Sequence, residues 1–431
     1  MLKERMNRIA NNAYVYSVFS KIVCVGLGMI YSILFARYFG AQYRGEAAVI
    51  LNYVSLFDVI LCLGIYQAYP YYKKNTAKEE KESFRRSFIN DTMGLFCFYS
   101  VICVILAITW QGEADYRILF LMLPFAFLVK MLNYVVLIDT PRIRNRASMI
   151  LYLIDIFLLI LLFIIYPKIN IYICFGFLII KQIYYAVIAF TNTQLKIFEI
   201  RPTISKEIPK YIRYGWLPML TVLMMSINYK IDTIMLDHYS FITKVDIGIY
   251  ALGVGLADKI WIIPDALKDI LLSKLANGKD KSEVEKICRI SLAITLICIL
   301  GIAVLGKPLI RLMYGEEYID SYGVTLIIVM GGIGMVFYKM IYSFNVINAR
   351  RVENLVLLVI SALFNVIMNL ILIPSYGIIG AAFASLISYL VCGFMFMISF
   401  IRYTGSSFKK LILLQTEDIE MLKSLRSSKQ S

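Results

Sequence analysis

Charged residues are scarce in this sequence, and histidine is almost absent. Asp, Glu, Lys and Arg make up 17% of the 431 residues, apolar and aromatic residues make up 60%, and His238 is the one histidine. A soluble protein of this length cannot cover so much apolar surface, whereas a membrane protein exposes it to lipid. A single histidine argues against a histidine-based metal site. The composition therefore predicts an integral membrane protein that holds no metal.

The eight cysteines lack the spacing of a metal site or of a disulfide framework, because all of them fall in or beside apolar runs. A nucleotide site is also missing. The stretch Gly301–Pro308 reads GIAVLGKP and fits the first part of a phosphate loop, but it lacks the Ser or Thr that holds magnesium and lies inside an apolar run. We expect no cofactor and no enzymatic activity.

Apolar runs long enough to cross a membrane repeat along the whole chain. A span needs about 20 apolar residues to cross roughly 30 Å of hydrocarbon, and the sequence contains about twelve such runs. They cover residues 12–39, 46–70, 87–110, 116–138, 147–166, 169–190, 211–236, 246–271, 287–310, 323–346, 352–374 and 377–401. The predicted fold class is all-α, with about twelve transmembrane helices in two six-helix bundles around a central cavity.

The excess of positive charge lies in alternate loops. The net charge is +15, and Lys and Arg gather in the loops 71–86, 191–210 and 272–286, while the intervening loops are short and carry few. Basic loops stay in the cytoplasm, so both termini are predicted to be cytoplasmic. Because the charge is spread over loops rather than over one face, we expect no nucleic-acid partner.

Two pairs of similar segments suggest an internal repeat. YFGAQYRGEAAVI resembles DHYSFITKVDIGIYAL, with Gly45 and Gly248 203 residues apart, and Pro167 and Pro374 are 207 residues apart in a second pair of similar runs. Nearly equal offsets predict two lobes of six spans that cross the membrane in the same sense. The predicted division is an N-terminal lobe over 1–195, a C-terminal lobe over 196–401 and a cytoplasmic tail over 402–431.

Several charges fall inside the apolar runs, where they are costly and therefore informative. Distance from the span ends places five of them near mid-membrane: Lys21, Asp58, Lys181, Asp258 and Lys259. Lys130 lies deeper toward the cytoplasm, and Lys230 and Asp232 lie toward the outside. Lys339 lies near a span end, where its side chain is expected to reach water.

The lysines have two interpretations. In the first, Lys21, Lys130, Lys181, Lys230 and Lys259 line a cationic cavity suited to a large, phosphate-bearing amphiphile. In the second, individual lysines are neutralised by Asp58, Asp155 or Asp258 in structural pairs between helices. Asp58, Asp232 and Asp258 are candidates for ion coupling or for charge pairing, and Asn228 and Ser226 lie near Asp232 on its helix.

The runs SINYKIDTIML, VDIGIYALGVGL, RLMYGEEY and NLILIPSYGIIGAAFASLISY, together with FARYFGAQYRGEAAV, resemble the polysaccharide flippases (Wzx-type) of the multidrug/oligosaccharidyl-lipid/polysaccharide exporter superfamily. The resemblance covers about residues 14–402. It implies a fold similar to that of MATE transporters and alternating access. The implied cargo is an undecaprenyl-pyrophosphate-linked oligosaccharide that crosses the bacterial cytoplasmic membrane during O-antigen or capsule synthesis.

The expected partners are therefore the lipid-linked oligosaccharide, membrane lipids and other polysaccharide-assembly proteins. Three rival functions stay open. A cation-coupled MATE-type multidrug exporter predicts an acid-dominated lumen. A polytopic polysaccharide polymerase or ligase predicts a large outward loop with arginines, and the sequence contains none. A scaffold for glycosyltransferases would survive the loss of every intramembrane lysine.

Overall fold

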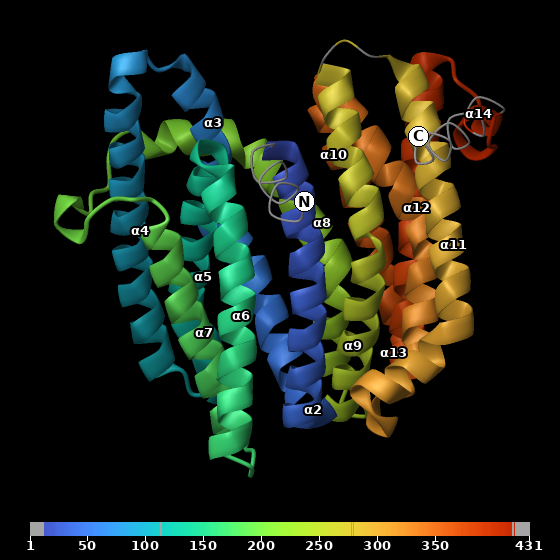
Figure 1. Cartoon of the computed structure of the whole chain (residues 1–431), viewed down its shortest axis with the longest axis horizontal. Helices are drawn as coiled ribbons and strands as arrows, with labels where there is room; N and C mark the ends of the chain where they lie inside the picture. Colours follow the sequence, from blue (N-terminus) through green and yellow to red (C-terminus); the bar gives the residue numbers. More distant parts are fainter. Residues whose placement is uncertain (1–12, 113, 277, 279, 416–417, 419–431) are drawn as a thin grey trace, which may run out of the picture. The chain divides into compact units, whose positions relative to one another are not determined.

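The computed structural model describes residues 13–112, 114–276, 278, 280–415 and 418 (Figure 1). The described residues form α-helices joined by short turns, and this confirms the predicted all-α class. The helices are α2 (Ala13–Leu61), α3 (Ile65–Asn75), α4 (Lys81–Thr109), α5 (Ala114–Asp139), α6 (Pro141–Ile165), α7 (Ile171–Thr191), α8 (Ile208–Asp237), α9 (Lys244–Ile260), α10 (Ile262–Ala276), α11 (Lys281–Tyr314), α12 (Ser321–Ile347), α13 (Arg351–Thr404) and α14 (Phe408–Ile412). Short 3₁₀ helices lie at η1 (Lys78–Glu80), η2 (Ile197–Glu199) and η3 (Glu316–Tyr318).

Helix α13 is a hairpin of two spans. Its 54 residues would extend about 80 Å as a straight helix, far more than a bilayer is thick. The chain turns at Gly377, whose φ of 56° and ψ of −133° are not helical. The Oγ atoms of Ser361 and Ser388, 27 residues apart, lie 3.3 Å from each other. The two arms of α13 therefore run side by side.

Helix α2 turns in the same way at Gly40, where φ is 70° and ψ is 178°. Arg44 donates a 3.3 Å hydrogen bond to the carbonyl of Ser32, twelve residues earlier, which a straight helix would place about 18 Å away. Within the described residues, ten helical segments are long and apolar enough to span a membrane. Counting both arms of α2 and of α13, they give the twelve predicted spans.

Two of the predicted spans contain breaks. The second span stops at Leu61, turns through Cys62–Gly64 and resumes as α3, with φ of 46° at Leu63 and 73° at Gly64. The eighth span breaks at Trp261 between α9 and α10. Pro264 lies three residues beyond that break, in the first turn of α10, where its missing N–H costs little. Helix α8 continues through Pro218.

The helices fall into two compact units. Unit 1 comprises residues 1–226 and 243–248, and unit 2 comprises 227–242 and 249–431. The division expected from the sequence, at residues 195/196 and 401/402, stays a prediction. Buried apolar side chains fill the described part of each unit, including Tyr69, Phe88 and Phe127 in unit 1 and Tyr318, Phe396 and Phe400 in unit 2.

Glycines allow the closest backbone contacts within unit 1. A Cβ on Gly45 would lie 1.9 Å from the carbonyl oxygen of Lys244, and a Cβ on Gly248 would lie 1.9 Å from that of Ala41. Real side chains do not tolerate such distances. The two contacts are reciprocal and share the 203-residue offset of the repeat found in the sequence, so both similar segments use their glycine for the same purpose.

Candidate functional site

In unit 1, Lys130 of α5 lies in an ion pair with Asp58 of α2, with 2.6 Å between Nζ and Oδ1. The side chains are 25% and 15% exposed respectively. At this distance the pair is hydrogen-bonded as well as charged. Lys130 is therefore not an uncompensated cation, and of the two roles considered for Asp58 the structure supports charge pairing.

Lys181 of α7 is neutralised in the same way. Its Nζ lies 3.0 Å from Oδ2 of Asp155 in α6, whose side chain is fully buried. Tyr184 and Tyr185 donate hydrogen bonds to the same carboxylate, and the Lys181 ammonium lies 4.0 Å from the ring centre of Tyr31. Of the two interpretations of Lys181, this geometry favours charge pairing, because Asp155 and the aromatic faces take up its charge. A role of Lys181 in binding the cargo stays a prediction.

Lys21, the remaining lysine predicted in unit 1, lies on the first arm of α2 with an exposed side chain. The other two lysines predicted for these spans, Lys130 and Lys181, are engaged by carboxylates on neighbouring helices of the same unit. The role predicted for Lys21 in binding the cargo stays a prediction.

In unit 2, charged side chains from four helices surround the break at Trp261. Lys259 of α9, Lys339 of α12 and Lys230 of α8 each interact electrostatically with the carboxylate of Asp258 in α9. Asp258 is exposed and Lys259 is partly exposed.

Lys339 differs from its prediction. It is buried, with 8% of its side chain exposed, and its Nζ lies 2.9 Å from Oδ2 of Asp265 in α10. Asp265 also accepts Lys268 at 3.4 Å. The lysine was expected to reach water because it lies near a span end, but instead it pairs with Asp265 of the same unit. Its ammonium group also lies 5.5 Å from the Trp261 ring centre.

Three aromatic rings pack at the same place. The ring centres of Tyr229, Trp261 and Tyr389 are 5.4, 5.8 and 5.3 Å apart in pairs. Trp261 is 5% exposed, and its indole nitrogen is a buried donor without a partner in the described structure. Carboxylates, ammonium groups and aromatic faces together can bind a ligand that has anionic, hydroxyl and apolar parts.

Asp232 lies deeper in unit 2 and is 1% exposed. Its carboxylate accepts hydrogen bonds from the hydroxyl of Tyr250, from Ser385 at 2.9 Å and from the backbone N–H of Thr233 at 2.7 Å. All three donors are neutral. No cationic side chain is among these three donors, so the site combines a buried carboxyl group with several oxygen atoms, which is the kind of site that binds a proton or a monovalent cation.

The polar network extends from Asp232 along the two arms of α13. Asn228, one turn earlier on α8, donates to Ser361 at 3.1 Å and accepts from Ser388 at 2.8 Å. Asn365 and Asn369 continue the face of Ser361 at four-residue spacing, and Nδ2 of Asn365 and Oδ1 of Asn369 are buried without a partner in the described structure.

Sequence reasoning found Asn228 and Asp232 but missed the other members of this network. The signal was present in the polar residues of the last two spans, at 361, 365 and 369 in one and at 385 and 388 in the other. Each set lies on one face of an otherwise apolar helix.

Comparisons with known proteins agree with this fold. No family model matches the chain. A protein of Haloferax volcanii described as "Probable flippase AglR" is 29% identical over 208 residues, 45% of this chain and 42% of that protein. A second from the same organism, "Probable low-salt glycan biosynthesis flippase Agl15", is 27% identical over 166 residues, 35% of this chain and 34% of that protein. The chain thus spans less than half of the length of these relatives.

The solved structures match over nearly the whole chain. The lipid II flippase MurJ, in an inward closed conformation, has a TM-score of 0.72 with 18% identity and covers 96% of this chain and 93% of its own. An inward-facing MATE-family transporter of the MOP superfamily has a TM-score of 0.64 with 14% identity, covering 90% and 100%. The fold is therefore that of MurJ and of MATE transporters, as the sequence resemblance implied, while the narrower likeness to the Wzx-type branch stays a prediction.

Proposed function

We propose that this protein is a flippase that moves lipid-linked oligosaccharides across a membrane by alternating access, without making or breaking a covalent bond. The main support is the full-length fold likeness to a lipid II flippase, together with two relatives described as flippases. The finer proposal is that the cargo is a repeat unit on undecaprenyl pyrophosphate, moved across a bacterial cytoplasmic membrane for surface polysaccharide synthesis.

The cargo site in this proposal includes the charged cluster of unit 2. Lys230 and Lys259 bind the pyrophosphate in this proposal, because they come from two helices and both interact electrostatically with Asp258, whose side chain is exposed. The aromatic rings around Trp261 pack against sugar faces. Lys130 and Lys181 keep the unit 1 helices paired and do not hold the cargo, while Lys21 stays a candidate contact.

The proposal is tested by the double variant K230A/K259A in vesicles that contain a fluorescent pyrophosphate-linked oligosaccharide lipid. Transport should fall by roughly tenfold or more per lysine, since a hydrogen bond to a charged group contributes about 1.5–3 kcal/mol. K307A removes an exposed lysine from α11 and is the matched control. Wild-type transport by the double variant at normal folding contradicts the charge-based mechanism.

The Asp232 network is proposed as the site of the coupling cation, a proton or a sodium ion. Its buried carboxylate, neutral donors and unpaired amide atoms support this. D232N should abolish the dependence of transport on an ion gradient but leave gradient-independent exchange of the lipid. D269N, at an exposed acid of α10, is the control. A D232N protein that still follows the gradient rejects this role.

The MATE-type exporter is the rival that the same fold supports. It predicts that overexpression protects cells from cationic dyes and that the unit 2 lysines do not affect this protection. The flippase proposal predicts no protection and loss of surface polymer in K230A/K259A cells. Dye resistance and surface-polymer levels, measured in the same set of strains, therefore separate the two functions.

A further inference from the structure

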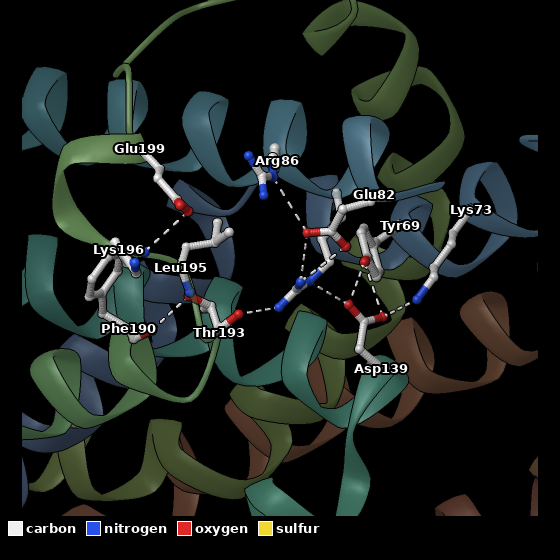
Figure 2. Close-up of polar contacts among 11 residues, drawn as sticks. Tyr69, Lys73, Glu82, Arg86, Asp139, Phe190, Thr193, Leu195, Lys196 and Glu199 are labelled. Atoms are coloured by element: carbon white, nitrogen blue, oxygen red, sulfur yellow. Dashed lines mark hydrogen bonds and ion pairs between the residues drawn. The ribbon is translucent and has the colours of Figure 1, made fainter. Parts of the chain in front are cut away.

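The segment between α7 and α8, residues 192–207, is held firmly at both ends. At its start, Arg85 of α4 donates to the carbonyl of Thr193. Arg85 is itself fixed by an ion pair with Asp139, 3.0 Å away. Asp139 also accepts Tyr69 at 2.8 Å and Lys73, so α3, α4 and α5 all meet at this point (Figure 2).

The far end of the segment is fixed on α4. Asp91, 3% exposed, accepts the hydroxyl of Thr203 at 3.1 Å and both the backbone N–H and the hydroxyl of Ser205 at 3.0 and 2.6 Å. The backbone of Arg201 donates to the Asn90 side chain. Gly94 allows this contact, because a Cβ there would lie 2.0 Å from the carbonyl of Thr203.

Between the two attachments, residues 194–200 form a projecting loop, which we call the linker tip. Its centre is η2, where Ile197 is 79% and Phe198 is 81% exposed, while Leu195 beside them is 8% exposed. In Figure 1 this segment lies beside α4 at the edge of its unit. Unit 1 thus holds two large apolar side chains outward on a fixed backbone, which is unfavourable in water.

The exposed residues of α4 show how deep the linker tip lies relative to the membrane surface. These residues are polar up to Arg86 and Ser87, and they are mainly apolar from Cys97 and Phe98 onward. The attachments at Asn90, Asp91 and Gly94 fall between these two zones. Because lipid-facing residues are apolar and water-facing residues are polar, this stretch of α4 lies at the boundary between membrane and water.

We propose that the linker tip is a membrane-interface anchor in which Ile197 and Phe198 insert between phospholipids and the flanking cations bind anionic headgroups. Lys196 and Arg201 are the exposed cations that flank this pair, against Glu199. An exposed apolar pair with basic neighbours at this depth fits the interfacial region of a leaflet. This inference is independent of the cargo and does not rest on the proposed function.

The test is the variant F198W in the full-length protein, reconstituted in phosphatidylcholine vesicles with and without phosphatidylglycerol. Emission of the wild-type protein, from Trp110, Trp216 and Trp261, is subtracted. The remaining emission, from the indole introduced at position 198, should be shifted to the blue and lost when the lipids carry bromine near the glycerol end of their chains. I197W is a second variant in case F198W does not fold.

K206W is the matched control, because it lies on the same linker beyond the tip and should stay red-shifted and unquenched. Quenching of the tryptophan at position 198 by brominated lipid should increase with the phosphatidylglycerol content. This increase should disappear when K196Q/R201Q is added to F198W. Emission from F198W and I197W that matches the K206W control overturns the proposal. A blue shift seen in native membranes but not in lipid vesicles also overturns it, since a protein partner then covers the tip.

Discussion

Asp155 of α6 carries the carboxylate that neutralises Lys181 of α7. It is fully buried and accepts Lys181, Tyr184 and Tyr185. Removing one member of a buried pair leaves the other charge without a partner, and this costs more than removing both. The pair therefore contributes to holding two helices in register, and its lysine need not touch a cargo.

We expect K181M to lower the free energy of unfolding by about 3–5 kcal/mol, because Asp155 is left buried and uncompensated. The double variant K181M/D155N should recover most of this loss. Thermal unfolding in detergent measures both. Transport by the double variant then separates the two roles of Lys181: activity near the wild-type level agrees with pairing, and its loss despite normal stability shows a direct role in binding the cargo.

Whether a lysine within a span is paired could not be decided from its position alone. The spacing from the span ends correctly put Lys130, Lys181 and Lys259 inside helices, and Asp58 and Asp155 were considered as partners. The partners are 72 and 26 residues away in sequence, and helix rotation decides whether they meet. Lys339 was placed by the same rule and is buried instead, because Asp265 lies within reach.

At the level of helices, apolar length predicted both the number of spans and the joints at Gly40 and Gly377, which lie between or at the ends of predicted spans and use a residue that tolerates positive φ. It did not predict the breaks inside the second and eighth spans, because the apolar run continues through each of them. The break at Leu63 has no proline and a non-glycine residue with φ of 46°. Only packing of the surrounding helices accounts for such a position.

The crossing of α12 and α13 gives a prediction at this scale. A Cβ on Gly334 would lie 2.0 Å from the carbonyl of Tyr389, so G334A should force the helices apart and destabilise the protein by about 1–3 kcal/mol or more. G301A on α11 is the control, since nothing lies within 4 Å of its Cβ. Equal unfolding temperatures for the two variants would contradict the close packing.

The segment after α13 gives a second, pH-dependent prediction. Arg289 of α11 donates to both oxygens of Asp418 and to the carbonyl of Lys410. Its hydrogen bonds to the carboxylate lower the pKa of Asp418 below its usual value. A carboxyl with a lowered folded pKa contributes stability above its unfolded pKa of about 3.9. The contribution is lost as the pH falls through the lower, folded pKa.

The protection factors for hydrogen exchange over residues 405–415, which correct for the pH dependence of the intrinsic rate, should therefore be high at neutral pH and fall below about pH 4. D418N should show fast exchange at neutral pH as well. K409Q, at an exposed residue of the same segment, should exchange like the wild type. Slow exchange in D418N at every pH would mean that Leu411 and its apolar contacts hold the segment without the ion pair.

At the scale of the whole molecule, composition and the spacing of apolar runs were sufficient for the fold class, and the fold likeness to MurJ agrees with it. The orientation in the membrane is a separate question that depends on loop charge. An even number of spans puts both termini on one side, and the basic loops 71–86, 191–210 and 272–286 define that side as cytoplasmic. This orientation is a prediction, and it decides which leaflet of the membrane the linker tip enters.

Fluorescent-protein fusions test this orientation, since the reporter folds only in the cytoplasm. Fusions at the N-terminus, at the C-terminus and in the loop at Gly278 should fluoresce, because basic loops flank each of them. A fusion in the short loop at Lys168, between α6 and α7, should not. Fluorescence at Lys168 with none at Gly278 would mean that the protein has the opposite orientation. Different results at the two termini would require an odd number of spans. In that second case one hairpin arm, of α2 or of α13, does not cross the membrane, and the charge alternation that predicts cytoplasmic termini fails at that arm.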